Sequence, residues 1–196
     1  MLASAGALLV LCGCGVSAEG GSAYRGVKLA HAIPRPSFTL TDTQGHPFDF
    51  RARTDSAVTL LYFGYLNCPD VCPVQMTNIA AVMRGLPYDV TRKLRVVFVT
   101  TDPARDTPEK LESWLGKFDP SFIGLRGTPE QVNAIEKSVN VAPAVAAPPD
   151  SSGSYEVGHA AQVIAFTPDD SAHVVYPFGT RQADWMHDLP LLAQVK

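Results

Sequence analysis

Residues 63–73 read Phe-Gly-Tyr-Leu-Asn-Cys68-Pro-Asp-Val-Cys72-Pro, with two cysteines four positions apart and a proline after each. The preceding residues 57–63 form an apolar run with β-branched and aromatic side chains, which is typical of a buried strand. After the cysteines, four apolar side chains recur at the spacing of one helical face: Met76, Ile79, Met83 and Leu86. The cysteine pair is therefore predicted to lie on a loop between a buried strand and the start of a helix.

The start of a helix has free backbone N–H groups and a partial positive charge. This environment lowers the pKa of a thiol and favours the thiolate, which is both the nucleophile and the metal ligand. Pro73 agrees with this placement, because proline suits the first turn of a helix. The arrangement is that of a thioredoxin-like active site, with three residues between the cysteines instead of two.

The chain has 196 residues, enough for one ordinary domain and a tail, and its net charge of -3 gives no indication of nucleic-acid binding. Its first fifteen residues are apolar, which suits a signal-peptide core and is short for a membrane span. Leu11-Cys12-Gly13-Cys14 fits the bacterial lipobox, although no Lys or Arg precedes the apolar core. The alternative is a hydrophobic tail with two incidental cysteines.

On the first interpretation, residues 1–14 are a lipoprotein signal that leaves a lipidated Cys14, and Cys12 is discarded with it. Residues 15–36, rich in Gly, Ser and Ala, are predicted to be a flexible tether. Residues 37–196 then form the domain. Outside the cytoplasm a close cysteine pair is structural, redox-active or metal-bound. A disulfide across four residues closes a small loop and would stabilise the fold little.

Strands and helices alternate along the domain. Strands are predicted at 94–101 and 121–125, and hairpins at 37–41 with 47–50 and at 162–166 with 172–176. Helices are predicted after Thr107-Pro108, after Thr128 with a capping box to Gln131, and from about Arg181, with Pro190 kinking or ending the last one. The Ala- and Pro-rich residues 141–154 are predicted to be a surface loop. This order predicts an α/β, thioredoxin-like fold: a central mixed sheet flanked by helices, with an N-terminal β-hairpin extension.

Loops after parallel strands meet at one edge of a sheet, so the cysteines and Asp102 are expected to share that edge. His159 can reach them if the strand after it is antiparallel to its neighbour, or if the long loop folds back. Two thiolates and one imidazole suit copper, and zinc is the alternative, although a closed zinc site usually needs a fourth strong ligand. Taken alone, an isolated histidine is weak evidence for a metal.

Residues 63–73 resemble the signature of the Sco/SenC copper-chaperone family. The resemblance continues through residues 97–107, 118–127 and 155–159, and it covers roughly residues 37–193. The family commonly has Asp before this histidine and Ser after it, where this chain has Gly158 and Ala160. The departure affects the surroundings of the histidine and not the histidine itself.

The resemblance implies a membrane-tethered thioredoxin-like domain on the outer face of the cytoplasmic membrane. Such proteins bind one copper and assist assembly of the binuclear copper centre of cytochrome c oxidase, by copper delivery, thiol reduction or both. Carried over, the ligands are Cys68, Cys72 and His159, with Asp70 and Asp102 close to them. The implied partners are the copper-centre subunit of the oxidase and, besides it, periplasmic copper chaperones or thioredoxin-like reductants. The chain is expected to be a monomer without enzymatic activity.

The rival hypothesis is an enzyme, a thiol-disulfide oxidoreductase that reduces the cysteines of the partner's copper site through Cys68 and Cys72. Metal binding needs His159, whereas disulfide exchange does not. A peroxiredoxin is not favoured, because the Pro-x-x-x-Thr/Ser-x-x-Cys motif does not occur at the cysteine loop.

Several polar and aromatic residues also have simpler interpretations. Asp70 and Asp102 are plausible turn residues, and Arg105 with Asp106 is predicted to be a local ion pair near a helix start. Tyr65 and Tyr155 are predicted to pack, with partner contact as the alternative. Met76 and Met83 are expected in the core, and His31, His46, His173 and His187 are not assigned to a metal.

Overall fold

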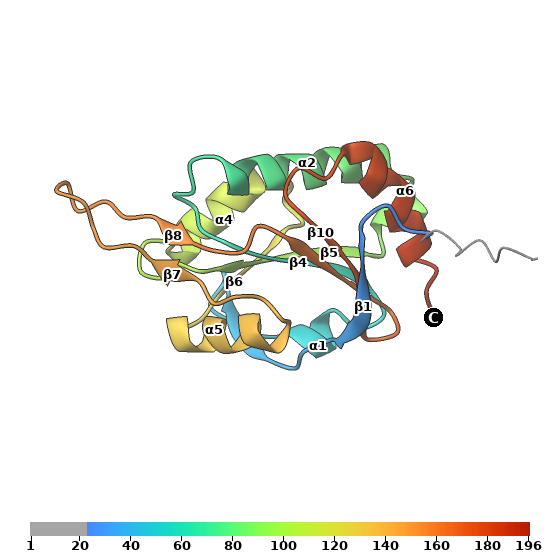
Figure 1. The fold of residues 1–196 in the computed structure, drawn as a ribbon, viewed down its shortest axis with the longest axis horizontal. Coiled ribbons are helices and arrows are strands. Elements are labelled where there is room, and N and C mark those ends of the chain that lie inside the picture. The colour runs from blue at the N-terminus through green and yellow to red at the C-terminus, as the bar shows by residue number, and fades with distance from the viewer. Residues whose placement is uncertain (1–22) are drawn as a thin grey trace, which may run out of the picture.

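The computed structural model describes residues 23–196, whose main sheet is covered by helices on both faces (Figure 1). The strands of the sheet are β1 (Val27–Pro34), β2 (Thr39–Asp42), β3 (Pro47–Asp49), β4 (Val58–Gly64), β5 (Leu94–Thr100), β6 (Ile123–Arg126), β9 (Val163–Thr167) and β10 (Ser171–Tyr176). The helices are α1 (Phe50–Arg53), α2 (Val71–Gly85), α3 (Tyr88–Thr91), α4 (Pro108–Gly116), α5 (Pro129–Ser138) and α6 (Gln182–Leu192).

The eight strands follow the order β1-β10-β9-β4-β5-β6-β2-β3. Strands β4, β5 and β6 are parallel to one another, whereas β9 runs antiparallel to β4 and β10 antiparallel to β9. The sheet is therefore mixed, as the sequence predicts, and the fold is thioredoxin-like. The predicted N-terminal hairpin is β2–β3, and β2 joins it to the sheet by pairing with β6.

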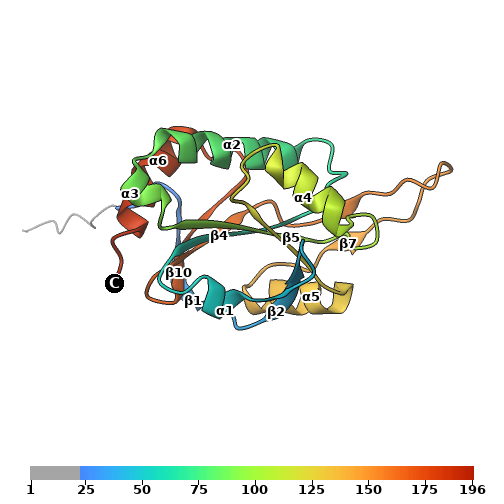
Figure 2. The same ribbon diagram turned by 180° about the vertical axis from the view of Figure 1, so that it is seen from behind.

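The sheet separates two cores. Helices α2, α4 and α6 cover one face and α1 and α5 cover the other, in both views (Figures 1 and 2). All seven residues of β4 are buried, and its side chains alternate between the cores: Leu60 and Tyr62 face the first, Leu61 and Phe63 the second. A strand buried on both faces explains why its sequence is continuously apolar.

The predicted tether is wrong for residues 27–34, which form strand β1 against β10. β10 would otherwise be an edge strand with unpaired backbone groups, and β1 satisfies them. The segment before β1 is held as well, because the backbone N–H groups of Arg25 and Gly26 donate to the buried carboxylate of Asp188 in α6. The predicted signal segment and Cys14 lie outside the described residues.

The predicted loop at 141–154 contains a short strand, β7 (Val145–Ala146), which pairs antiparallel with β8 (Val157–Gly158). We call residues 144–158 the arm. Figure 1 shows the arm projecting beyond the end of the sheet. Each of its strands has only two residues, which is too short to show a periodic pattern in the sequence.

The C-terminal helix differs from the prediction in one respect. α6 includes Pro190 and ends two residues later, at Leu192. A proline this close to the end of a helix removes one backbone hydrogen bond and leaves the preceding turns intact. None of the helices within residues 23–196 is both long enough and apolar enough to cross a membrane.

Candidate metal centre

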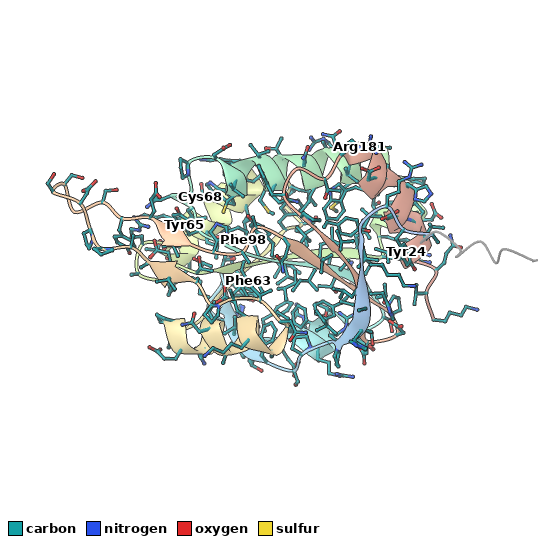
Figure 3. All side chains as sticks on the ribbon, viewed as in Figure 1. Tyr24, Phe63, Tyr65, Cys68, Phe98 and Arg181 are labelled. Carbon is teal, nitrogen blue, oxygen red and sulfur yellow. The ribbon has the colours of Figure 1, made fainter. Side chains whose placement is uncertain are left out.

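The two cysteines lie where strand β4 passes into helix α2. Cys68 is in the connecting loop, and Cys72 is the second residue of α2. His159 directly follows β8 and precedes β9. Because β9 is antiparallel to β4, its first residues lie at the end of the sheet where β4 stops. Figure 3 shows Cys68 and Tyr65 at this end and Tyr24 at the opposite end.

The ligand atoms of Cys68, Cys72 and His159 lie within 4.8 Å of one another. The Sγ of Cys72 is 3.4 Å from Nε2 of His159, and the backbone N–H of Cys72 donates to Sγ of Cys68 at 3.4 Å. Both cysteines are free thiols; the side chain of Cys72 is fully buried and Cys68 is 8% exposed. The structure therefore brings together the three residues that the sequence selected.

The ring of His159 is oriented by its own neighbour. Its Nδ1 lies 3.0 Å from the carbonyl oxygen of Ala160. A carbonyl only accepts hydrogen bonds, so Nδ1 carries the proton, and in the neutral ring the lone pair of Nε2 points at the sulfur of Cys72. Burial lowers the pKa of His159 and favours this neutral form. The imidazole is thus prepared to act as a metal ligand at Nε2.

The pKa of the Cys72 thiol differs from the prediction, which was that the helix start lowers it. Burial raises the pKa of Cys72 to about 12, although the hydroxyl of Tyr62 donates to its sulfur at 3.6 Å. Loss of water around the sulfur outweighs the hydrogen bonds from Tyr62 and from the backbone that lower the pKa, so the expected lowering at a helix start does not occur. Cys72 is therefore a protonated thiol in the metal-free protein, and it becomes a thiolate only when a cation takes the place of its proton.

Gly64 and two tyrosines shape the walls of the site. A Cβ atom at Gly64 would lie 2.8 Å from Sγ of Cys72, so only glycine allows this approach. The rings of Tyr62 and Tyr65 pack edge-on against the imidazole of His159, with centroids 6.1 and 5.6 Å away. Tyr62 is a site residue that was not predicted from the sequence. Strand alternation is a signal that would have found it, because residues 62 and 64 face the same side of β4.

Asp102 is buried and holds the arm. Its carboxylate accepts a hydrogen bond from the hydroxyl of Tyr155 at 2.9 Å and forms an ion pair with Arg105. The predicted local pair of Arg105 with Asp106 is therefore wrong. The carboxylate of Asp106 instead accepts from the backbone N–H of Leu66, at 3.1 Å, and from the hydroxyl of Thr100.

Asp70 caps the N-terminus of α2 by position but not by a side-chain hydrogen bond, and its side chain is exposed. Met76 is fully buried in the core, as predicted, and away from solvent. Two of the histidines that were not assigned to a metal have acidic partners: His173 lies beside Asp169 and His187 beside Asp188, at 2.7 and 2.8 Å.

Comparison with known proteins agrees with this site. The sequence model of the SCO1/SenC family matches residues 28–194. The protein SenC of Rhodobacter capsulatus is 42% identical over 106 residues, which are 48% of this chain and 46% of SenC. In eight curated relatives, the matched parts span between 25% and 65% of the relative's own length.

Two solved structures have the same fold. The copper-bound ScoI of Bradyrhizobium japonicum is 30% identical, with a TM-score of 0.72 over 82% of this chain and 99% of ScoI. The apo Sco1 protein of Thermus thermophilus is 29% identical, with a TM-score of 0.76 over 86% of this chain and 96% of Sco1. Since the family match covers nearly all of the described residues, the chain belongs to the SCO1/SenC family.

Proposed function

We propose that this protein is a copper metallochaperone that binds one copper ion through Cys68, Cys72 and His159. The observation that carries the proposal is the convergence of two sulfurs and one imidazole nitrogen within 4.8 Å. Two soft donors and one borderline donor suit copper in either common oxidation state. Membership of the SCO1/SenC family and the copper-bound state of ScoI support the same assignment.

Three donors leave an open position, which suits a protein that passes its metal on. Copper is the cargo, and its capture releases the proton of Cys72, since burial holds that thiol protonated in the metal-free protein. His159 needs no deprotonation, because its Nε2 lone pair already faces the sulfur. A recipient with more ligands or better-placed ones then displaces the three donors one at a time.

The proposed recipient is the binuclear copper centre of cytochrome c oxidase, as the family resemblance implies. We place the protein outside the cytoplasm, held on the outer face of the cytoplasmic membrane by a lipid on Cys14. Asp70 and Asp102 are proposed to act around the ligands, Asp70 through the charge of the cysteine loop and Asp102 through the arm.

A thiol-disulfide oxidoreductase is the second candidate. It is favoured by one observation, the presence of two free thiols close together at the junction of β4 and α2. In that reaction Cys68 and Cys72 would reduce a disulfide of the partner and become a disulfide themselves, and copper would not be held stably.

The experiment is a copper titration of the reduced full-length chain in a Cys12→Ser/Cys14→Ser background, which leaves only the two site thiols. The proposal expects one copper per chain and a thiolate-to-Cu(II) absorption band. Both are expected to be lost when Cys68→Ser and Cys72→Ser are introduced together, and to be weakened by His159→Ala. A protein that binds no copper but reduces disulfides would favour the oxidoreductase, and a His159→Ala variant that binds like the wild type would remove His159 from the site.

A further inference from the structure

The turn between β5 and α4 contacts both halves of the candidate metal centre. Its consecutive residues Arg105 and Asp106 reach in different directions, one toward the arm and one toward the cysteine loop. The cysteine loop and His159 come from distant parts of the chain, since Cys72 and His159 are 87 positions apart. A separate element that touches both can set the distance between them.

Asp106 holds the cysteine loop. Its side chain is 1% exposed, and one carboxylate oxygen accepts from the N–H of Leu66 at 3.1 Å and from the hydroxyl of Thr100 at 2.5 Å. Leu66 lies two residues before Cys68. A buried carboxylate that accepts two hydrogen bonds fixes the path of the loop just before its first sulfur.

Arg105 holds the segment that carries His159. Its Nη1 donates to the carbonyl of Tyr155 at 2.9 Å, and its guanidinium lies 3.5 Å from the centre of the Tyr155 ring. The same guanidinium is 5.8 Å from the ring of Tyr65, which packs edge-on against the imidazole of His159. Arg105 therefore fixes the chain four residues before His159 and supports the aromatic wall beside it.

The turn itself is fixed to the sheet. Arg126, the last residue of β6, donates through Nε to the carbonyl of Asp106 at 2.6 Å and through Nη2 to the carbonyl of Pro103 at 2.8 Å. The ion pair between Arg105 and Asp102 closes the turn from within. A turn held in this way moves with the sheet and not with either loop.

We infer that Arg105 and Asp106 are positioning residues: Asp106 places the two sulfurs, Arg105 places the imidazole, and the turn sets the distance between them. The inference rests on the proposed copper function and deepens it. It requires the two residues to act on different ligands. Loss of Arg105 should leave copper on the cysteines without its nitrogen ligand, and loss of Asp106 should weaken the sulfur side.

The test compares Arg105→Met with Arg92→Met, which replaces an exposed arginine directly after α3, at the other end of the molecule (Figure 2). Removing a group that orients a ligand typically lowers metal affinity by about 10- to 100-fold. Arg105→Met is expected to show that loss together with weaker nitrogen hyperfine coupling in the electron paramagnetic resonance spectrum of the Cu(II) form. Arg92→Met is expected to match the wild type.

A double-mutant cycle separates positioning from general destabilisation. In a His159→Ala background, Arg105→Met should lower copper affinity by no more than about twofold, because the ligand it positions is already absent. Asp106→Ala should lower the affinity in both backgrounds, and Asp106→Asn, which keeps the shape and one acceptor, should lower it less. If Arg105→Met lowers copper affinity by the same factor in the His159→Ala background as in the wild type, the inference is wrong.

Amide hydrogen exchange gives a readout that needs no copper. Arg105→Met should speed exchange in residues 155–160 and not at Leu66, and Asp106→Ala should speed exchange at Leu66 and not in residues 155–160. If Arg105→Met does not fold, Arg105→Lys provides the same test, because lysine keeps the charge but cannot bond to Asp102 and Tyr155 in the same way. If the wild type binds no copper while the two variants show these exchange patterns, the proposed function alone is refuted; if exchange in the variants is unchanged from the wild type, the positioning is refuted.

Discussion

Replacing Gly64 with alanine is expected to disturb the candidate metal centre from inside the sheet. The added methyl carbon would lie 2.8 Å from Sγ of Cys72, 2.8 Å from Cε1 of Tyr62 and 3.2 Å from Cε2 of Phe98. All three side chains are fully buried, so none can turn away into solvent. The strain must therefore be relieved by movement of packed groups, among them a proposed copper ligand.

The size of the effect follows from these distances. The sulfur of Cys72 must retreat by about 0.6 Å to pass from 2.8 Å to the 3.4 Å at which ordinary contact begins. Overpacking of this kind typically costs about 1–3 kcal/mol of folding free energy. A functional ligand set tolerates displacements of about 0.5 Å, so copper affinity should fall along with stability.

Urea unfolding of the reduced, metal-free protein measures the first effect, and a copper competition titration measures the second. Gly116→Ala is the matched control, since nothing lies within 4 Å of its added carbon and it ends helix α4. That variant should keep its copper affinity and gain up to about 1 kcal/mol of stability. If Gly64→Ala unfolds at the wild-type midpoint and binds copper equally well, the sulfur is not packed against β4 as described.

Three further predictions concern stability. The unfolded chain releases the Cys72 proton near its ordinary pKa, whereas the folded protein holds it until about pH 12, so stability falls as pH rises through this interval. Between about pH 8 and pH 10, the metal-free wild type should lose about 1.5 kcal/mol more than Cys72→Ala does in urea unfolding, and equal losses would contradict the raised pKa. Thr128→Ala removes both bonds of the capping box of α5 and should cost about 1 kcal/mol in the same assay; an unchanged midpoint would show that the cap contributes nothing. Arg35→Met removes four hydrogen bonds to buried acceptors, while Asp170 keeps its ion pair with Arg51, so thermal unfolding should show a loss of about 2–4 kcal/mol from the acceptors left without a donor, and a loss below about 1 kcal/mol would contradict this.

The elements around the cysteines could be predicted because their signals are local. Each signal lies within a few positions of the element that it predicts. Examples are the apolar run of β4, the helical spacing after Cys72, and the capping residues Thr107 and Thr128. Strand β1 was not predicted, since its residues are mostly exposed and its pairing partner β10 lies far along the chain. An edge strand forms because a neighbour offers free backbone groups, and its own sequence need not show it.

By itself, the sequence determined the α/β order, the place of Cys68 and Cys72 at a strand–helix junction, and the family resemblance that singled out His159. Only the tertiary structure decided three further points. The antiparallel run of β9 brings His159 to the sulfurs, burial raises the pKa of Cys72 against the helix terminus, and Arg105 pairs with Asp102 and Tyr155 instead of Asp106. These points depend on residues that are distant in sequence, because such residues bury a group or form its hydrogen bonds. The spacing of residues along the chain does not predict those contacts.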